Sequence, residues 1–187
     1  MTVSARDIAA ELRRRDPRLG LAKLHKLLYY VQGWHLAWTG DPAFEEQVEA
    51  WTNGPVVADL WREERYDSPR PHRPPRIDDR TLAVIDYVCS RYGQKSGSQL
   101  IQMTHTEDPW QEVSQRDDDT SFGTAEITPR AMRSWFEQDD EHGRLKAEAE
   151  RLRQEHPVSF TPADPTPERL AAIRRARTGA VQQTRPA

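Results

Sequence analysis

The apolar positions of residues 21–39 cover almost the whole circumference of a helix. They recur at three- and four-residue spacings, and Tyr29 and Leu36 widen the stripe. A helix that is apolar on nearly every side has to be buried on nearly every side. The pattern therefore predicts a central helix over residues 21–39, which Gly40 ends. The spacing is carried by Leu24, Leu27, Leu28, Tyr30, Val31, Trp34 and Trp38.

Shorter amphipathic segments on both sides predict the helices that surround this central one. Ser4 with Asp7, and Ser96 with Gln99, have the spacing of capping boxes, and Asp78 or Asp79 precedes another apolar run as a cap. The fold class expected is mainly α: a compact bundle of about six or seven helices around the buried central helix, with a minor β-ribbon and a charged helical C-terminal extension. The surrounding helices are expected near residues 4–15, 56–66, 79–92, 96–103, 109–113 and 129–136.

Two glycine and proline positions carry specific backbone predictions. Residues 48–51 alternate in polarity and predict a strand of the ribbon, and an Asn53-Gly54-Pro55 corner follows them. We expect Pro55 to open the next helix at Val56, because a proline at the first helical position lacks only an N–H that would have no partner. Gly93 is expected to end its helix in the left-handed conformation.

The apolar pattern stops at Phe136, and the composition then changes. Residues 139–156 are dominated by charged side chains, four prolines follow, and the end of the chain is basic. Such a segment has too few apolar residues to pack firmly by itself. We therefore expect a domain over 1–138 and, over 139–187, a charged helical extension, a proline linker and a flexible basic tail. Its isolated apolar residues are Leu145, Leu152, Leu170 and Ile173.

Composition limits the cellular setting. The net charge of −3 gives no overall attraction to nucleic acid or to an anionic membrane. The single cysteine, Cys89, excludes an internal disulfide, no run approaches the roughly 20 apolar residues of a membrane span, and the N-terminus has no apolar signal core. We expect a cytoplasmic protein with no membrane contact and no nucleic-acid partner.

Histidines are the first candidates for metal binding or acid–base chemistry. His25 and His35 are ten residues apart on one helix and cannot chelate the same ion from it. No metal-binding motif occurs, so no metal or other cofactor is expected. His105 has two interpretations: a general base or partner contact, or a structural residue that bonds the last helical carbonyls or Asp108. The second is favoured, because no nucleophile is evident.

Tryptophans and arginines are the remaining candidates for a binding surface. Trp51, Trp61, Trp110 and Trp135 are expected mostly in the core, and an exposed one would be a binding anchor. Basic residues concentrate at 13–15, in the 67–76 segment and near the C-terminus. If these basic residues lay on one face, they could bind DNA phosphates. The negative net charge favours the alternative, a solvated or partner-facing surface.

Four short motifs in order resemble the Panacea domain of bacterial and phage antitoxins. The first is Lys26-Leu27-Leu28-Tyr29, and the second is Ala50-Trp51 with Gly54-Pro55-Val56. Thr104-His105 with Pro109-Trp110 is the third, and Ile127 through Met132 to Trp135-Phe136 is the fourth. The similarity covers roughly residues 4–138.

This resemblance implies a phage-associated or bacterial antitoxin that neutralises a toxin by binding it, and not an enzyme. The partner implied is a cognate toxin encoded next to it. Two alternatives stay open, a DNA-binding regulator and a hydrolase that uses His105. Residues after Phe136 are the candidate partner-binding arm. The motif residues, structural or partner-binding, are Lys26, Leu28, Tyr29, Trp51, Gly54, Pro55, Val56, His105, Pro109 and Trp110.

Overall fold

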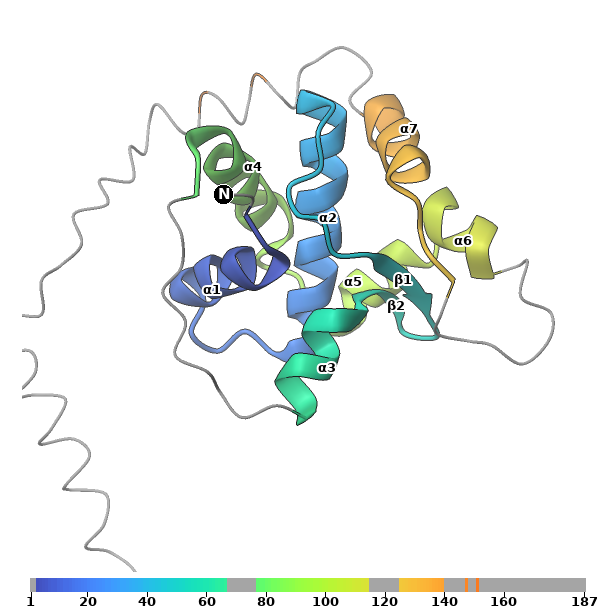
Figure 1. Ribbon diagram of the computed structural model, residues 1–187, viewed down its shortest axis with the longest axis horizontal. Coiled ribbons are helices and arrows are strands. Elements are labelled where there is room, and N and C mark those ends of the chain that lie inside the picture. The colour runs from blue at the N-terminus through green and yellow to red at the C-terminus, as the bar shows by residue number, and fades with distance from the viewer. Residues whose placement is uncertain (1–2, 67–76, 115–124, 140–146, 148–150, 152–187) are drawn as a thin grey trace, which may run out of the picture. The chain divides into compact units, whose positions relative to one another are not determined.

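The computed structural model describes residues 3–66, 77–114, 125–139, 147 and 151 (Figure 1). These residues form seven helices and one two-stranded ribbon, which confirms the mainly α fold predicted from the pattern. In chain order the elements are α1 (Ala5–Arg15), α2 (Leu21–Thr39), β1 (Val48–Trp51), β2 (Gly54–Val57), α3 (Ala58–Tyr66), α4 (Asp79–Tyr92), α5 (Gly97–Thr104), α6 (Asp108–Ser114) and α7 (Pro129–Asp139).

Helix α2 is the central element, as its apolar pattern predicts. Every residue from Leu24 to Leu36 is buried, the polar ones included. Helices α1, α4, α5 and α7 and strand β2 all pack on it, and Figure 1 shows them on different sides of it. The helix ends where Gly40 takes a φ of 83° and donates its N–H to Leu36.

The predicted caps are confirmed, but one helix ends differently. Ser4 and Ser96 both form capping boxes, and Asp78 caps α4. The prediction of a left-handed Gly93 is wrong, since its φ of −61° is right-handed. The carbonyl of Gly93 accepts a hydrogen bond from Lys23 on α2. The N–H of Gly93 donates to the carbonyl of Cys89, so the backbone is still helical at this residue.

The second strand of the ribbon, β2, lies where the sequence pattern predicted the start of a helix. Pro55 does not open a helix: it lies within β2, and α3 begins only at Ala58. Beyond the other edge of β1, the N–H of Ile127 donates to the carbonyl of Val48 at 2.8 Å. A corner that resembles a helix start therefore continues the sheet instead.

Helix α7 lies against α2 at a point where α2 has no side chain. Gly33 faces the ring of Phe136, and a Cβ at Gly33 would overlap that ring. Phe136 also makes edge-to-face contacts with Tyr29, Tyr30 and Trp34. Gly33 thus determines how closely α7 approaches α2.

We expect Gly33→Ala to lower stability, although alanine usually favours the middle of a helix by about 1 kcal/mol. The new methyl group would displace Phe136 at a cost of roughly 1–3 kcal/mol. Thermal melting measures the loss, and adding Phe136→Leu should restore part of it. Gly97→Ala is the control, because its Cβ would make only ordinary contacts. A Gly33→Ala protein that melts above the wild type would contradict this packing.

Candidate functional site

Residues from three of the motifs meet at one buried point, which we call the motif cluster: Lys26, Gly54, Pro55 and Thr104. The Nζ of Lys26 donates to the carbonyl of Pro55 at 2.8 Å, and Lys26 is only 2% exposed. Gly54 has a φ of +85°, and a Cβ there would lie 2.6 Å from the Thr104 Oγ1 and 2.7 Å from the Lys26 Cε. Only glycine suits both the backbone angle and the space.

The free edge of β2 faces α2. Val48 and Ala50 of β1 bond the 125–127 segment through their backbone groups. Since an antiparallel strand directs its backbone groups to alternate sides, the partners of these residues, Val57 and Pro55, direct theirs away from β1. This is a position where a proline removes no ladder hydrogen bond.

Two side chains of α2 close that edge. Lys26 binds the carbonyl of Pro55, and the N–H of Val57 donates to the Nδ1 of His25 at 3.4 Å. The side chains thus take the place of a neighbouring strand, and no unpaired edge is left to attract another chain. The Lys26–Tyr29 motif and the Gly54–Val56 motif therefore contact each other, one from the helix and one from the ribbon.

Burial changes the protonation of both α2 side chains. It lowers the pKa of Lys26 to about 7, and no carboxylate among the described residues forms an ion pair with this amine. Burial, together with the nearby Lys26 charge, lowers the pKa of His25 to about 4. His25 is therefore neutral near pH 7, which matches the role of its Nδ1 as an acceptor.

A second buried group joins α2 to the start of α6, and we call it the Glu107 cluster: Tyr29, Tyr30 and Glu107. The hydroxyls of Tyr29 and Tyr30 donate to the two carboxylate oxygens of Glu107 at 2.9 and 2.8 Å. Burial raises the pKa of Glu107 to about 7, although both hydroxyls favour the charged form. Burial also raises the pKa of both tyrosines, so they stay protonated donors.

His105 lies at the outer side of the motif cluster. A structural role was predicted for this residue, but its contact is a different one. Its imidazole stacks on Trp110 with ring centroids 4.1 Å apart, instead of bonding the helix carbonyls or Asp108 as expected. Trp110 in turn donates from its Nε1 to the carbonyl of Trp51 at 3.0 Å. Burial lowers the pKa of His105, and the Lys26 charge lowers it further. This aromatic contact joins the TH-PW motif to the end of β1.

The predicted site residues divide by exposure. Leu28, Val56 and Pro109 are buried, whereas Trp51, His105 and Trp110 are half-buried. Trp61 and Trp135 are half-buried as well, so none of the four tryptophans expected mostly in the core is fully enclosed. The candidate arm residues Leu145, Leu152, Leu170 and Ile173 lie outside the described residues.

Sequence reasoning missed three residues of the site: Tyr30, Thr104 as a contact of Gly54, and Glu107. A charged residue in a polar stretch such as THTED is ordinarily exposed. The signal available was the pair of adjacent tyrosines in KLLYY, because buried tyrosines need acceptors for their hydroxyls. Nothing local in the sequence, however, indicates which carboxylate supplies them.

The surroundings of His105 and the acidic, histidine and cysteine side chains were candidates for catalytic or metal-binding groups. No hydroxyl, thiol or carboxylate of the described residues hydrogen-bonds to the His105 imidazole, and no cluster of their His, Cys, Asp and Glu side chains could hold a metal ion. A search of the same residues also finds no helix long and apolar enough to cross a membrane. Lys26 and Trp110 of the motifs instead donate their hydrogen bonds to backbone carbonyls inside the domain.

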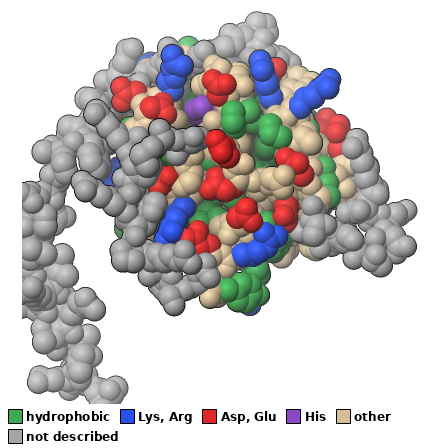
Figure 2. All heavy atoms as spheres, in the orientation of Figure 1, with side chains coloured by type: hydrophobic (Ala, Val, Ile, Leu, Met, Phe, Trp, Pro, Cys, Tyr) green, Lys and Arg blue, Asp and Glu red, His purple; other side chains and the backbone are tan. Residues whose placement is uncertain are grey.

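The arginine run of α1 is paired with carboxylates. Arg13 binds both oxygens of Glu64 at 2.6 and 2.7 Å, and Arg15 binds Glu11 and Asp86. Arg14 also binds Glu11. On the face that Figure 2 shows, acidic and basic side chains are interspersed. Neither observation favours a phosphate-binding surface.

The region that contains the first three motifs is similar to a known protein family. Residues 24–111 match the family model described as antitoxin SocA-like, Panacea domain. This part of the chain is therefore similar to an antitoxin Panacea domain. The match spans α2 to α6, and thus both the motif cluster and the Glu107 cluster, whereas α7 with the fourth motif lies beyond it. No curated protein and no solved structure matches the chain.

We expect the stability of this domain to rise with pH above 7 because of Lys26. The folded state releases the Lys26 proton near pH 7, whereas the unfolded chain holds it to about pH 10.5. The unfolded state thus binds more protons in this window, and the free energy of unfolding should rise by about 2 kcal/mol between pH 7 and pH 9. Urea unfolding at several pH values measures this slope.

Lys26→Met is the matched variant, since it keeps the length of the side chain and removes the titrating amine. The rise attributed to Lys26 should be absent in it. Glu107 does not interfere, because its folded-state pKa of about 7 exceeds its ordinary value of 4.5 and places its own effect between pH 4.5 and 7. Parallel stability curves for the two proteins above pH 7 would show that the amine is not buried.

Proposed function

We propose that this Panacea-domain protein is an antitoxin that neutralises a cognate toxin by binding it directly, and that a neighbouring gene encodes the toxin. The observation that carries the proposal is the match of residues 24–111 to an antitoxin domain. Direct binding agrees with a site whose polar groups are used for internal contacts. The protein is expected to act in the cytoplasm, as its single cysteine suggests.

Physical chemistry favours binding over catalysis for His105. A general base needs an accessible nitrogen near a reacting group, with a pKa suited to the reaction. The ring lies flat against Trp110, and its Nε2 is buried with no hydrogen-bond partner. We therefore assign His105 a packing role at the junction of α5, α6 and β1.

Co-expression with the neighbouring gene tests the function. The wild-type protein should restore growth to cells that express the toxin and should co-purify with it. His105→Gln should protect nearly as well as the wild type, because packing and not proton transfer is proposed for this residue. Its melting temperature shows whether it remains folded.

The opposite result would identify an enzyme. A folded His105→Gln variant that still binds the toxin but no longer protects would support the hydrolase alternative. If the wild type neither protects nor binds, the antitoxin proposal fails. Binding of the wild-type protein to DNA, without any effect on the toxin, would favour the regulator.

We also propose that residues after Phe136 form an arm that contacts the toxin. Leu145, Leu152, Leu170 and Ile173 are isolated apolar residues in a charged segment, and such segments often become ordered on a partner. The family match ends at residue 111, so this segment is free to differ between proteins that face different toxins.

Truncation after Gln138 tests the arm. The shortened protein should keep a cooperative thermal transition, because α1 to α7 contain the buried core. Its affinity for the toxin should fall by roughly tenfold or more, as expected when a segment that folds on binding is removed. Full protection by the truncated protein would eliminate the arm and move the contact to the helical domain.

A further inference from the structure

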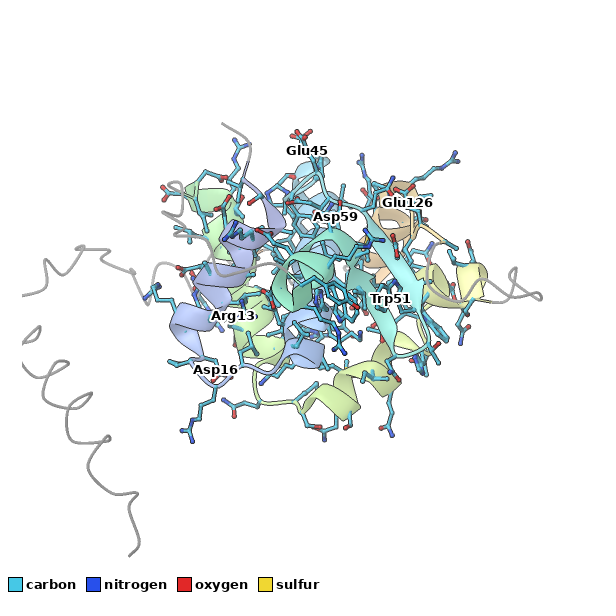
Figure 3. All side chains as sticks on the ribbon, turned by 60° about the horizontal axis from the view of Figure 1, so that its bottom comes forward. Arg13, Asp16, Glu45, Trp51, Asp59 and Glu126 are labelled. Carbon is cyan, nitrogen blue, oxygen red and sulfur yellow. The ribbon has the colours of Figure 1, made fainter. Side chains whose placement is uncertain are left out.

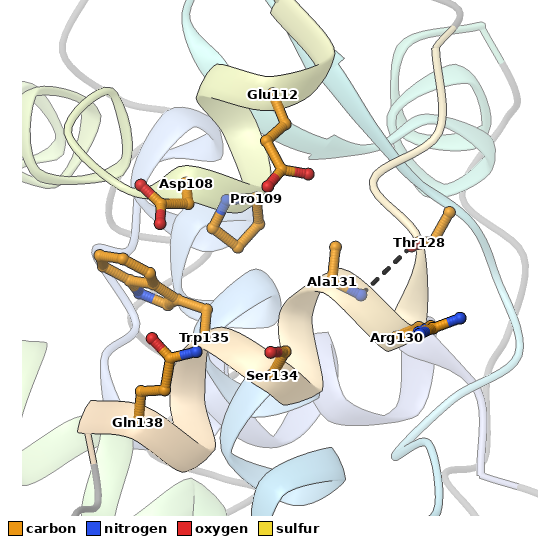
Figure 4. Close-up of a pocket in the computed structure, with 9 residues that line it drawn as sticks. All are labelled: Asp108, Pro109, Glu112, Thr128, Arg130, Ala131, Ser134, Trp135 and Gln138. Carbon is orange, nitrogen blue, oxygen red and sulfur yellow. Dashed lines mark hydrogen bonds between the residues drawn. The ribbon is translucent and has the colours of Figure 1, made fainter.

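An open groove of about 500 Å³ lies between α6 and α7 (Figure 4). Pro109 and the half-buried indole of Trp135 supply apolar surface, and Asp108, Glu112 and Gln138 supply polar groups. None of these residues belongs to the motif cluster or to the Glu107 cluster. The groove is therefore a separate feature on the outside of the domain.

The polar groups are not distributed evenly along the groove. Figure 4 shows Asp108, Trp135 and Gln138 together at one end, with the carboxylate of Glu112 directed over the middle. Arg130 lies at the opposite end, and its guanidinium points away from Trp135. Asp108 is exposed and has no hydrogen-bond or ion-pair partner among the described residues. The Trp135 end thus combines an aromatic ring, an amide and negative charge.

We propose that the Trp135 end of this groove receives a lysine or arginine side chain of the toxin. An indole attracts a cation over its face, and a nearby carboxylate adds a charge-assisted hydrogen bond. The amide oxygen of Gln138 can accept a further one. A negatively charged ligand would instead be repelled by the Asp108 carboxylate.

The position of the groove suits selection among toxins. The family match ends at residue 111 and includes Asp108 and Pro109 of the α6 wall. The α7 wall of the groove lies beyond the match. Trp135 belongs to the fourth motif and Gln138 to none of them, and neither side chain is part of the motif cluster. This inference rests on the proposed function, and it names the charge of the toxin segment that is bound.

Binding of the purified product of the neighbouring toxin gene to single-residue variants tests the inference. Asp108→Asn removes the charge with little change in shape and should weaken binding about tenfold. Asp108→Lys and Gln138→Lys place a like charge beside the incoming cation, and each should weaken binding by roughly tenfold to a hundredfold. Raising the salt concentration should weaken the wild type more than Asp108→Asn.

Glu45→Lys is the matched control, because Glu45 is an exposed carboxylate before β1 that Figure 3 shows directed outward. It should bind the toxin as the wild type does, and melting temperatures confirm that each variant is folded. Folded Asp108 and Gln138 variants that bind within twofold of the wild type would overturn the groove and leave the antitoxin function standing. A wild-type protein that does not bind this toxin would overturn both.

Discussion

The hydrogen bond from the buried Lys26 amine to the Pro55 carbonyl is the contact on which the arrangement of the domain depends. It lies between the central helix and the one edge of the ribbon that has no neighbouring strand. An unpaired buried carbonyl would cost about 1–3 kcal/mol, and burying an ammonium group costs more. The protein reconciles the two by giving the amine a pKa of about 7, so that either protonation state can donate.

This contact lies in a closely packed interior that several of the motif residues fill. Lys26, Gly54 and Thr104 fit together so closely that a single methyl group at Gly54 would not be accommodated. Glu107 similarly depends on two tyrosines of α2 for its hydrogen bonds. A partner that binds the outer surfaces, such as the α6–α7 groove, can therefore change without altering the fold.

The sequence predicted the elements better than it predicted their contacts. The period of α2, the capping boxes at Ser4 and Ser96 and the end at Gly40 depend on neighbouring residues, and all were recovered. Pro55 was misplaced because its role depends on an amine 29 residues earlier in the chain. The motif residues themselves were identified, but the burial of Glu107 could not be, since its partners lie 77 and 78 residues away.

An NMR titration of the Lys26 side chain tests the central claim most directly. The carbon shift of its Cε follows protonation of the amine, and the signal is assigned by its absence in Lys26→Met. A buried amine that binds Pro55 should titrate with a midpoint near pH 7. A midpoint near 10.5, the ordinary value for lysine, would place the amine in water and contradict the proposed closure of the ribbon edge.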